Sequence, residues 1–238
     1  MSSQFYLDKL YPLQDQVLAV IAKLDTKFYL TGGTAVSRYY FHHRFSDDLD
    51  FFLNHDNDFI SEAEKILEGL KSVYGESTRL SLKQERFVRL FVSYDDTVLK
   101  IEMINDVGYR YGDSNVVNGI KIDNIQNVLS NKLSALQRNA PKDVSDILLI
   151  VFNLRFSWID VFEQAKNKDT WVNEIDVATQ LDDYEIENLQ AVKWTKEPDY
   201  LFLKKCLHVI AKDILLGADN SLCGLGNEQL AFHNGANY

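Results

Sequence analysis

The chain has 238 residues, a formal net charge of −10, 46% hydrophobic and 25% charged residues, and only two cysteines, Cys206 and Cys223. This composition is ordinary for a globular protein of one large or two small domains; it disfavours a disulfide framework and, through its excess of acid, indiscriminate nucleic-acid binding. No stretch reaches 18 apolar residues and the N-terminus has no continuous apolar run, so we expect no membrane span, no signal peptide and a cytoplasmic location.

The first half of the chain alternates helical and strand patterns. Apolar positions from Tyr6 to Ile21 recur at helical spacing, and the later strands alternate apolar and polar residues. The predicted elements are a helix over 5–24, a strand over 27–31, a helix over 34–42, a strand over 48–53, a helix over 58–74 ending at Gly75, strands over 77–83, 86–94 and 97–104, and an irregular ribbon over 107–123.

From about residue 124 every pattern is helical. The predicted helices cover 124–138, 142–155, 157–168, 172–192 and 198–216, with breaks at Pro141 and Pro198, and the tail 217–238 is predicted to be irregular. We therefore predict an α+β fold, with an N-terminal mixed-sheet domain and flanking helices over 1–123 and a C-terminal helical bundle over 124–238.

Two acids flank Leu49 at the start of the predicted strand 48–53. Because successive side chains of a strand point to opposite faces, Asp48 and Asp50 share one face while Leu49 points into the core. Two neighbouring carboxylates repel each other, so a positive charge is expected between them. Mg²⁺ fits, because it prefers oxygen ligands and leaves positions open for substrate phosphates.

Gly32 and Gly33 separate a strand from a helix just before these acids. Glycine lets the backbone approach a ligand closely, and the helix that begins near Thr34 aims free N–H groups at an anion. A phosphate cradle beside a paired-carboxylate metal site is the machinery of nucleotidyl transfer.

These residues resemble the signature of the polymerase-β-like nucleotidyltransferase superfamily, which is Gly-Gly or Gly-Ser, a helix, and then Asp-x-Asp. The variant Arg-x-Ser-x-Asp-x-Asp, formed here by Arg44, Ser46, Asp48 and Asp50, is similar to that of the AbiEii/AbiGii toxin-type nucleotidyltransferases. The resemblance spans about residues 27–150.

The superfamily places a third carboxylate on a nearby strand, and Glu102 is the best match, although the family more often has Asp. Val98, Lys100 and Glu102 share one face of the strand 97–104. If this strand pairs with 48–53, Glu102 lies roughly 5 Å from the aspartates and completes a triad. Lys100 would then contact phosphate. An exposed sheet face that carries a charged pair is the alternative.

A downstream helical motif of the toxin-type family also has counterparts here. They are Lys132, Lys142, Asp143 and Asp146. Asp143 also fits the first turn of a helix that begins at Pro141, where an acid interacts favourably with the helix dipole. Asp146 leads into an apolar run, so it needs a cationic partner such as Lys132 or Arg138.

The resemblance implies a nucleotidyltransferase that moves a nucleoside monophosphate from an NTP to an acceptor. It further implies an RNA acceptor, plausibly the 3′ end of tRNA, and a separately encoded antitoxin. Asp48, Asp50 and Glu102 would hold two Mg²⁺ ions, with Mn²⁺ as a substitute. The expected nucleotide-binding residues are Gly32, Gly33, Thr34, Arg44, Ser46, Lys132 and Asp146.

Two other functions share parts of this pattern. A small-molecule nucleotidyltransferase of the aminoglycoside or lincosamide kind would use the same sheet domain, and an acidic cleft would suit a cationic antibiotic. A nucleotide-binding interaction protein without catalysis is the second, and the retained acids argue against it. Lys83, Arg86 and Arg89 form a basic stretch that is either a nucleic-acid contact or a solvated face.

Overall fold

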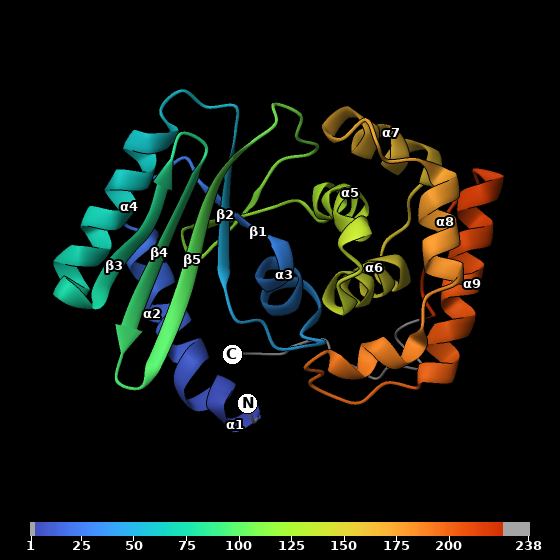
Figure 1. The fold of residues 1–238 in the computed structure, drawn as a ribbon, viewed down its shortest axis with the longest axis horizontal. Helices are drawn as coiled ribbons and strands as arrows, with labels where there is room; N and C mark the ends of the chain where they lie inside the picture. Colours follow the sequence, from blue (N-terminus) through green and yellow to red (C-terminus); the bar gives the residue numbers. More distant parts are fainter. Residues whose placement is uncertain (1–2, 226–238) are drawn as a thin grey trace. The chain divides into compact units, whose positions relative to one another are not determined.

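The computed structural model describes residues 3–225, which form two compact units (Figure 1). Among the described residues, one unit comprises residues 3–35 and 45–124, and the other comprises residues 36–44 and 125–225. The segment Val36–Arg44 therefore belongs to the helical unit, although the sequence places it within the domain 1–123. The chain passes between the units three times, after Ala35, Arg44 and Asn124.

The first unit, called the sheet unit, is built on a mixed sheet, as predicted, and this sheet has seven strands. Its strand order is β3-β4-β5-β2-β1-β7-β6, and the β2–β5 and β1–β7 pairs are parallel while the others are antiparallel. The strands are β1 (Tyr29–Thr31), β2 (Leu49–Asn54), β3 (Thr78–Gln84), β4 (Phe87–Tyr94), β5 (Thr97–Asp106), β6 (Asn115–Val117) and β7 (Ile120–Ile122).

The segment predicted as an irregular ribbon supplies β6 and β7. Asn118 and Gly119 between them both have positive φ, +49° and +80°, as a two-residue hairpin turn requires. β7 then joins the sheet beside β1, with Leu30 opposite Ile122. The strands are only three residues long, so their alternation is too brief to be recognised from sequence.

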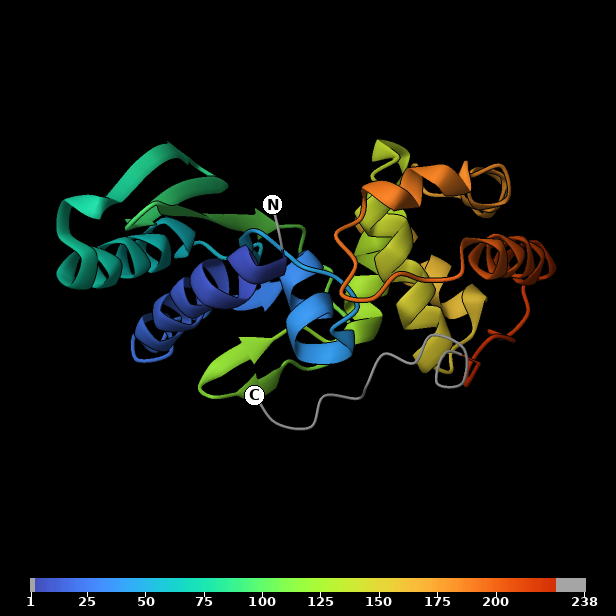
Figure 2. The same cartoon turned by 90° about the horizontal axis from the view of Figure 1, so that it is seen from below.

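Helices cover one face of strands β3–β5. They are α1 (Ser3–Phe5), η1 (Tyr6–Leu10), α2 (Tyr11–Ile21) and α4 (Phe59–Tyr74), followed by the short turn η3 (Gly75–Ser77). Alternate residues such as Leu90 and Ile101 point to this face and are completely buried, and so is Ile66 of α4. α2 and α4 lie along the same side of the strands (Figure 2). Leu67 of α4 is only half-buried, although it follows the completely buried Ile66.

The predicted helix 5–24 is present, but its first part is wound as a π-helix, η1. Pro12 follows one turn later and has no backbone N–H, so the regular hydrogen-bond ladder cannot continue through it. Tyr6, Leu10 and Leu13 nevertheless point into the core, with exposures of 1–3%.

The helical unit contains η2 (Ala35–Phe41), except for Ala35, and the described helices that follow β7. These are α5 (Ile125–Ala135), η4 (Leu136–Arg138), α6 (Pro141–Asn153), α7 (Trp158–Lys168), α8 (Glu174–Asp182), η5 (Ile186–Ala191) and α9 (Tyr200–Leu216). α6 lies at its centre, because all its residues from Asp143 to Phe152 are buried. Within residues 3–225 no helix is both long and apolar enough to span a membrane.

The predicted helix 172–192 is in fact two, α8 and η5. The amine of Lys204, from α9, donates to the backbone carbonyls of Asp182 (2.5 Å) and Tyr184 (3.0 Å). These bonds satisfy carbonyls that end α8, so the chain can turn there. Of the predicted irregular tail, residues 226–238 lie outside the described residues.

Candidate active site

The two aspartates lie at the start of β2, on the face opposite its buried residues. Leu49 and Phe51 are buried, with exposures of 0% and 1%, whereas Asp48 and Asp50 are half-buried. Asp50 is paired with Thr31 of β1 on one side and with Glu102 of β5 on the other. The predicted pairing of the Glu102 strand with the aspartate strand is therefore confirmed.

Glu102 is held by two basic side chains. Arg89, its cross-strand neighbour on β4, lies with Nε at 2.7 Å and Nη2 at 2.6 Å from Oε1. The Lys100 Nζ lies 3.1 Å from the other oxygen and 2.9 Å from Asp48 Oδ2, so one ammonium bridges two carboxylates.

These contacts decide the charge states. Burial raises the pKa of Glu102, but hydrogen bonds from Lys100 and Arg89 outweigh it and the net pKa is lowered. Burial has the opposite effect on Lys100 and lowers its pKa, but its hydrogen bonds to Asp48 and Glu102 outweigh burial, so the net pKa of Lys100 is raised. Glu102 is thus an anion and Lys100 a cation at neutral pH.

The three acids do not form a three-ligand group in this arrangement. Among the described residues no set of three Asp, Glu, His or Cys side chains is placed to share a metal ion. The physical reason lies in the pairing: Glu102 directs both oxygens to Arg89 and Lys100.

Gly32 lets the backbone lie directly against the Asp50 carboxylate. Its φ is +67°, and a Cβ atom there would lie 2.8 Å from Asp50 Oδ2. Both the backbone conformation and the close approach therefore require glycine. The oxygens of a carboxylate such as Asp50 are suitable donors for a hard divalent cation. Gly33 follows in the short helix α3 (Gly32–Thr34), which runs on into η2.

Thr34 and Ser46 lie beneath the acids and are almost completely buried, with exposures of 1% and 8%. Their hydroxyls are 2.9 Å apart, and Thr34 also donates to the backbone carbonyl of Asp48. Gln14 donates to the carbonyls of Ser46 (3.1 Å) and Asp47 (3.2 Å). Thr34 and Gln14 thus fix the backbone from Ser46 to Asp48, and the two hydroxyls position Asp48.

Arg44, Lys132 and Asp146 meet within the helical unit, in a buried charge network. Arg44 Nε and Nη2 lie 2.7 and 2.8 Å from the two oxygens of Asp146. The Lys132 Nζ lies 2.6 Å from Asp146 and 2.6 Å from Asp143. All four side chains are at most 8% exposed. The predicted Lys132 partner of Asp146 is confirmed, whereas Arg138 pairs with Asp143 instead, at 3.0 Å.

His43 completes this network. Its Nε2 lies 3.0 Å from Asp146 Oδ1, and its Nδ1 has no hydrogen-bond partner in the part of the chain described. Burial lowers the pKa of His43, so the ring is neutral and donates from Nε2. Burial alone would raise the pKa of Asp146, but the charges of Arg44 and Lys132 hold it well below 3.8.

Sequence reasoning missed two residues near the acids. Asp123, completely buried after β7, accepts a hydrogen bond from Thr31 (2.6 Å), the residue opposite Asp50. Arg110 lies 3.3 Å from Asp123 and places its guanidinium 4.2 Å from the centre of the Tyr29 ring. A charged residue at the end of an apolar run, as in Ile-Lys-Ile-Asp, was the available signal.

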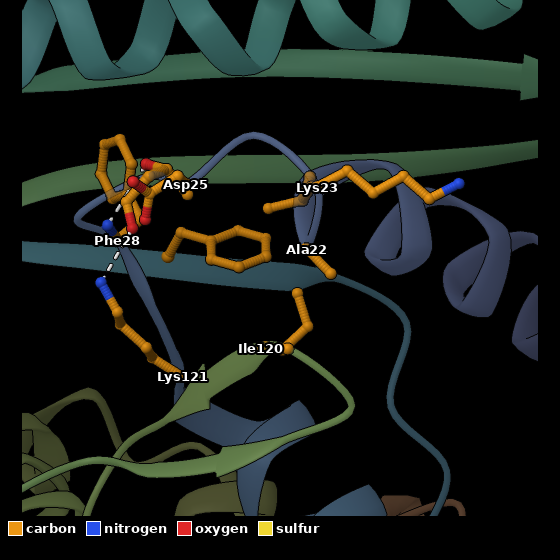
Figure 3. A pocket seen from close by; sticks show the side chains of 10 residues that line it. Ala22, Lys23, Asp25, Phe28, Ile120 and Lys121 are labelled. Carbon is orange, nitrogen blue, oxygen red and sulfur yellow. Dashed lines mark hydrogen bonds between the residues drawn. The ribbon is translucent and has the colours of Figure 1, made fainter.

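A pocket of about 140 Å³ lies elsewhere in the sheet unit. Ala22, Phe28 and Ile120 line its apolar part, and the Lys121 amine donates to the Thr26 carbonyl at its rim, 3.0 Å away (Figure 3). None of the predicted site residues lines this pocket. It is therefore separate from the acids.

Residues 16–199 match the profile of the family described as "Nucleotidyl transferase AbiEii toxin, Type IV TA system". The chain belongs to the AbiEii family. It is accordingly a nucleotidyltransferase of toxin–antitoxin type. No curated protein sequence matches it.

Solved structures with a similar fold share little sequence with this AbiEii protein. A candidate nucleotidyltransferase from H. pylori is 20% identical, with a TM-score of 0.59, over 90% of this chain and 96% of that one. JHP933 from Helicobacter pylori is 20% identical, with a TM-score of 0.58, over 90% and 93%. The MenT4 nucleotidyltransferase toxin from Mycobacterium tuberculosis is 14% identical, with a TM-score of 0.57, over 87% and 82%. At these identities the likeness establishes the fold alone.

Replacing Gly32 by alanine should destabilise the sheet unit and displace Asp50. A non-glycine residue at this positive φ costs about 1–3 kcal/mol, and the new methyl would contact Asp50. Gly75→Ala is the matched control, because Gly75 has φ +54° with no atom near its missing Cβ. Denaturant unfolding of both variants separates the cost of the backbone strain from the cost of the contact with Asp50. Equal losses of unfolding free energy in the two variants would show that the close approach to Asp50 is unimportant.

Asp146→Asn should lower the free energy of unfolding by about 3–5 kcal/mol, because it leaves buried cations without their counter-charge. The depressed pKa means that the Asp146 contribution is fully present above about pH 4 and is lost as the pH falls through the folded-state value. The variant should therefore lose less stability than the wild type between neutral and strongly acidic pH. Unfolding curves across this range measure the effect.

Asp182→Asn serves as the comparison for this charge network. Asp182 pairs with His208 at 2.6 Å, with both side chains well exposed. Such pairs contribute about 0–1 kcal/mol. A similar loss in both variants would contradict the importance of the buried network.

Proposed function

We propose that this AbiEii protein transfers a nucleoside monophosphate from an NTP to the 3′ hydroxyl of an RNA, with Mg²⁺ as cofactor. The observation that carries the proposal is the pair Asp48 and Asp50 on one sheet face, with the Asp50 carboxylate against Gly32 and its backbone opposite Glu102. In this reaction the acceptor oxygen attacks the α-phosphorus, the bond to the β-phosphate breaks, and pyrophosphate leaves.

Asp48 and Asp50 would hold the Mg²⁺, and Mn²⁺ would substitute for it. When bound, the ion neutralises phosphate charge and orients the attacking and leaving oxygens. Glu102 remains the candidate for a second ion. Because its oxygens contact Arg89 and Lys100, it would take that role only after exchanging one of these partners.

The residues expected to bind nucleotide divide into two groups. Gly32 and Gly33 would contact the triphosphate through their backbone, while Thr34 and Ser46 would act by positioning Asp48 through their hydrogen bonds. Lys100 adds a positive charge beside the acids and would contact a phosphate.

The remaining expected residues, Arg44, Lys132 and Asp146, stay proposed nucleotide-binding residues. Their charges pair with one another inside the helical unit. A direct phosphate contact would therefore require Lys132 or Arg44 to keep a donor available beyond these pairs.

An RNA acceptor and an antitoxin follow from the proposed toxin function. The family is that of a type IV toxin–antitoxin system, which supports an antitoxin partner. We propose that the enzyme acts in the cytoplasm, where its two cysteines, which form no disulfide in the structure, would stay reduced.

Asp48→Asn and Asp50→Asn should each abolish transfer of label from an NTP to RNA in the presence of Mg²⁺, because each removes a proposed metal ligand. Asp50→Asn should leave the unfolding free energy unchanged or higher, since it relieves repulsion between carboxylates. Asp96→Asn is the control, because Asp96 forms its ion pair with Lys9 at the exposed β4–β5 turn, away from the proposed metal ligands. Undiminished transfer by Asp48→Asn or Asp50→Asn would remove that residue from the metal site.

Glu102→Gln and Lys100→Gln should have opposite kinetic signatures. If Glu102 acts as the third carboxylate, Glu102→Gln lowers kcat far more than it weakens NTP binding. Lys100→Gln should mainly raise KM for the NTP, because it removes a phosphate contact. Steady-state kinetics for both variants measure the split, and loss of NTP binding by Glu102→Gln with little change in kcat would make Glu102 a positioning residue instead.

A further inference from the structure

The face of β3–β5 opposite α4 carries aromatic and basic side chains together. Along β4, Val88, Leu90 and Val92 point toward α4 and are buried, so the residues that alternate with them point to the other face of the sheet. Those residues are Phe87, Arg89 and Phe91, all half-buried. We call this face, with Arg79 of β3 and Lys100 of β5, the open sheet face; α2 and α4 lie on the opposite side of these strands (Figure 2).

Two arginines on this face lie over two of its rings. The Arg79 guanidinium is 5.4 Å from the centre of the Phe91 ring, and the Arg89 guanidinium is 5.2 Å from that of Phe87. Arg79 and Phe91 are cross-strand partners. Aromatic rings and guanidinium planes on a sheet are the surfaces on which unpaired bases stack.

The charge of this region is opposite to that of the whole protein. On the open sheet face Arg79, Arg89 and Lys100 are basic; Arg89 and Lys100 pair with Glu102, and Arg79 is exposed above the Phe91 ring, whereas the formal net charge of the chain is −10. Basic side chains gathered on one face of an acidic protein favour a polyanionic ligand there. The residues of the basic stretch noted in the sequence thus lie on both faces of the sheet. Arg89 lies on the open sheet face, while Lys83 pairs with Glu64 of α4 on the other face.

The register connects this surface to the proposed catalytic acids. Leu82 lies opposite Arg89, Arg89 opposite Glu102, and Glu102 opposite Asp50. A parallel row of partners joins Phe87 to Ile104 and Ile104 to Phe52, two residues after Asp50 on the same face. A nucleic-acid chain whose bases stack on this face can therefore run across β4 and β5 and reach Asp50 on β2.

We propose that the open sheet face binds single-stranded RNA and directs its 3′ end to Asp48 and Asp50. This inference rests on the proposed function and names the form of its acceptor. Phe87 and Phe91 are four residues apart on one strand, about 13 Å, so each can stack with a different base. A duplex keeps its bases paired and cannot use these rings.

The test measures binding of a fluorescein-labelled oligoadenylate RNA to the full-length protein by fluorescence anisotropy, without NTP or divalent metal. The same RNA annealed to its complement is the duplex probe. Phe91→Leu keeps apolar volume and removes the ring, and Arg79→Gln removes the exposed guanidinium. Lys83→Gln is the matched control, because Lys83 is on the same strand as Arg79 but pairs with Glu64 on α4.

We expect the single strand to bind more tightly than the duplex. Phe91→Leu and Arg79→Gln should each weaken single-strand binding about tenfold, and Lys83→Gln should change it by less than about twofold. Unfolding curves verify that Phe91→Leu is folded; if it is not, Arg79→Gln alone decides. Equal binding of single strand and duplex, unchanged binding by the decisive variant, or no binding of RNA by the wild type would overturn the proposal.

The proposed function and this inference can fail separately. If Phe91→Leu binds RNA normally while Asp50→Asn abolishes transfer to RNA, the enzyme function stands and the open sheet face is not the RNA site. If the wild type binds single strands through Phe91 and Arg79 but transfers no nucleotide, the RNA site stands and the proposed reaction is wrong.

Discussion

The helical unit is organised around one buried negative charge. Asp146 lies in a helix whose neighbouring residues are all buried, and an isolated carboxylate in such surroundings would be protonated or would unfold the helix. Arg44 satisfies both of its oxygens, Lys132 contacts it from α5, and neutral His43 donates a third hydrogen bond. Because Arg44 and His43 come from early in the sequence, the segment Val36–Arg44 is tied to helices formed about a hundred residues later. Replacing the network by apolar groups could match its stability, but removing one member leaves a charge without a partner.

In the sheet unit, by contrast, the acids lie near the surface, and their ion-pair partners can be exchanged. Lys100 bridges Asp48 and Glu102 while remaining 30% exposed, so water and ions can compete for these contacts. Such pairs contribute little to stability, which suits a site that must accept and release charged ligands. The buried hydroxyls of Thr34 and Ser46 supply the rigidity instead, because they hold the backbone of Asp48 from below. Within this short motif, the buried hydroxyls keep the backbone rigid, while the half-exposed carboxylates can exchange their partners.

Alternation along β2 and β5 was sufficient to predict the face on which Asp50 and Glu102 lie, because one residue of slip would bury both acids. The partners of those acids were harder to predict. Arg89 reaches Glu102 only through the β4–β5 register, and β7 joins β1 across some ninety residues of chain. Arg44 was expected to bind phosphate because it is the first residue of the toxin-type motif, yet its charge pairs with Asp146. Local patterns fix which way a side chain points; long-range packing decides what it meets. The break after α8 has the same origin, since Lys204 that ends the helix comes from α9.

Three passages of the chain between the units make the helical unit unsuitable as an independent module. A fragment that begins at Ile125 would contain Asp146 and Lys132 but would lack Arg44 and His43, because these belong to the earlier segment. Its central helix would then carry a carboxylate that keeps its contact with Lys132 but lacks the three hydrogen bonds from Arg44 and His43. Gene fusion, domain exchange or limited truncation at the apparent boundary near residue 124 would therefore yield neither half in its native form.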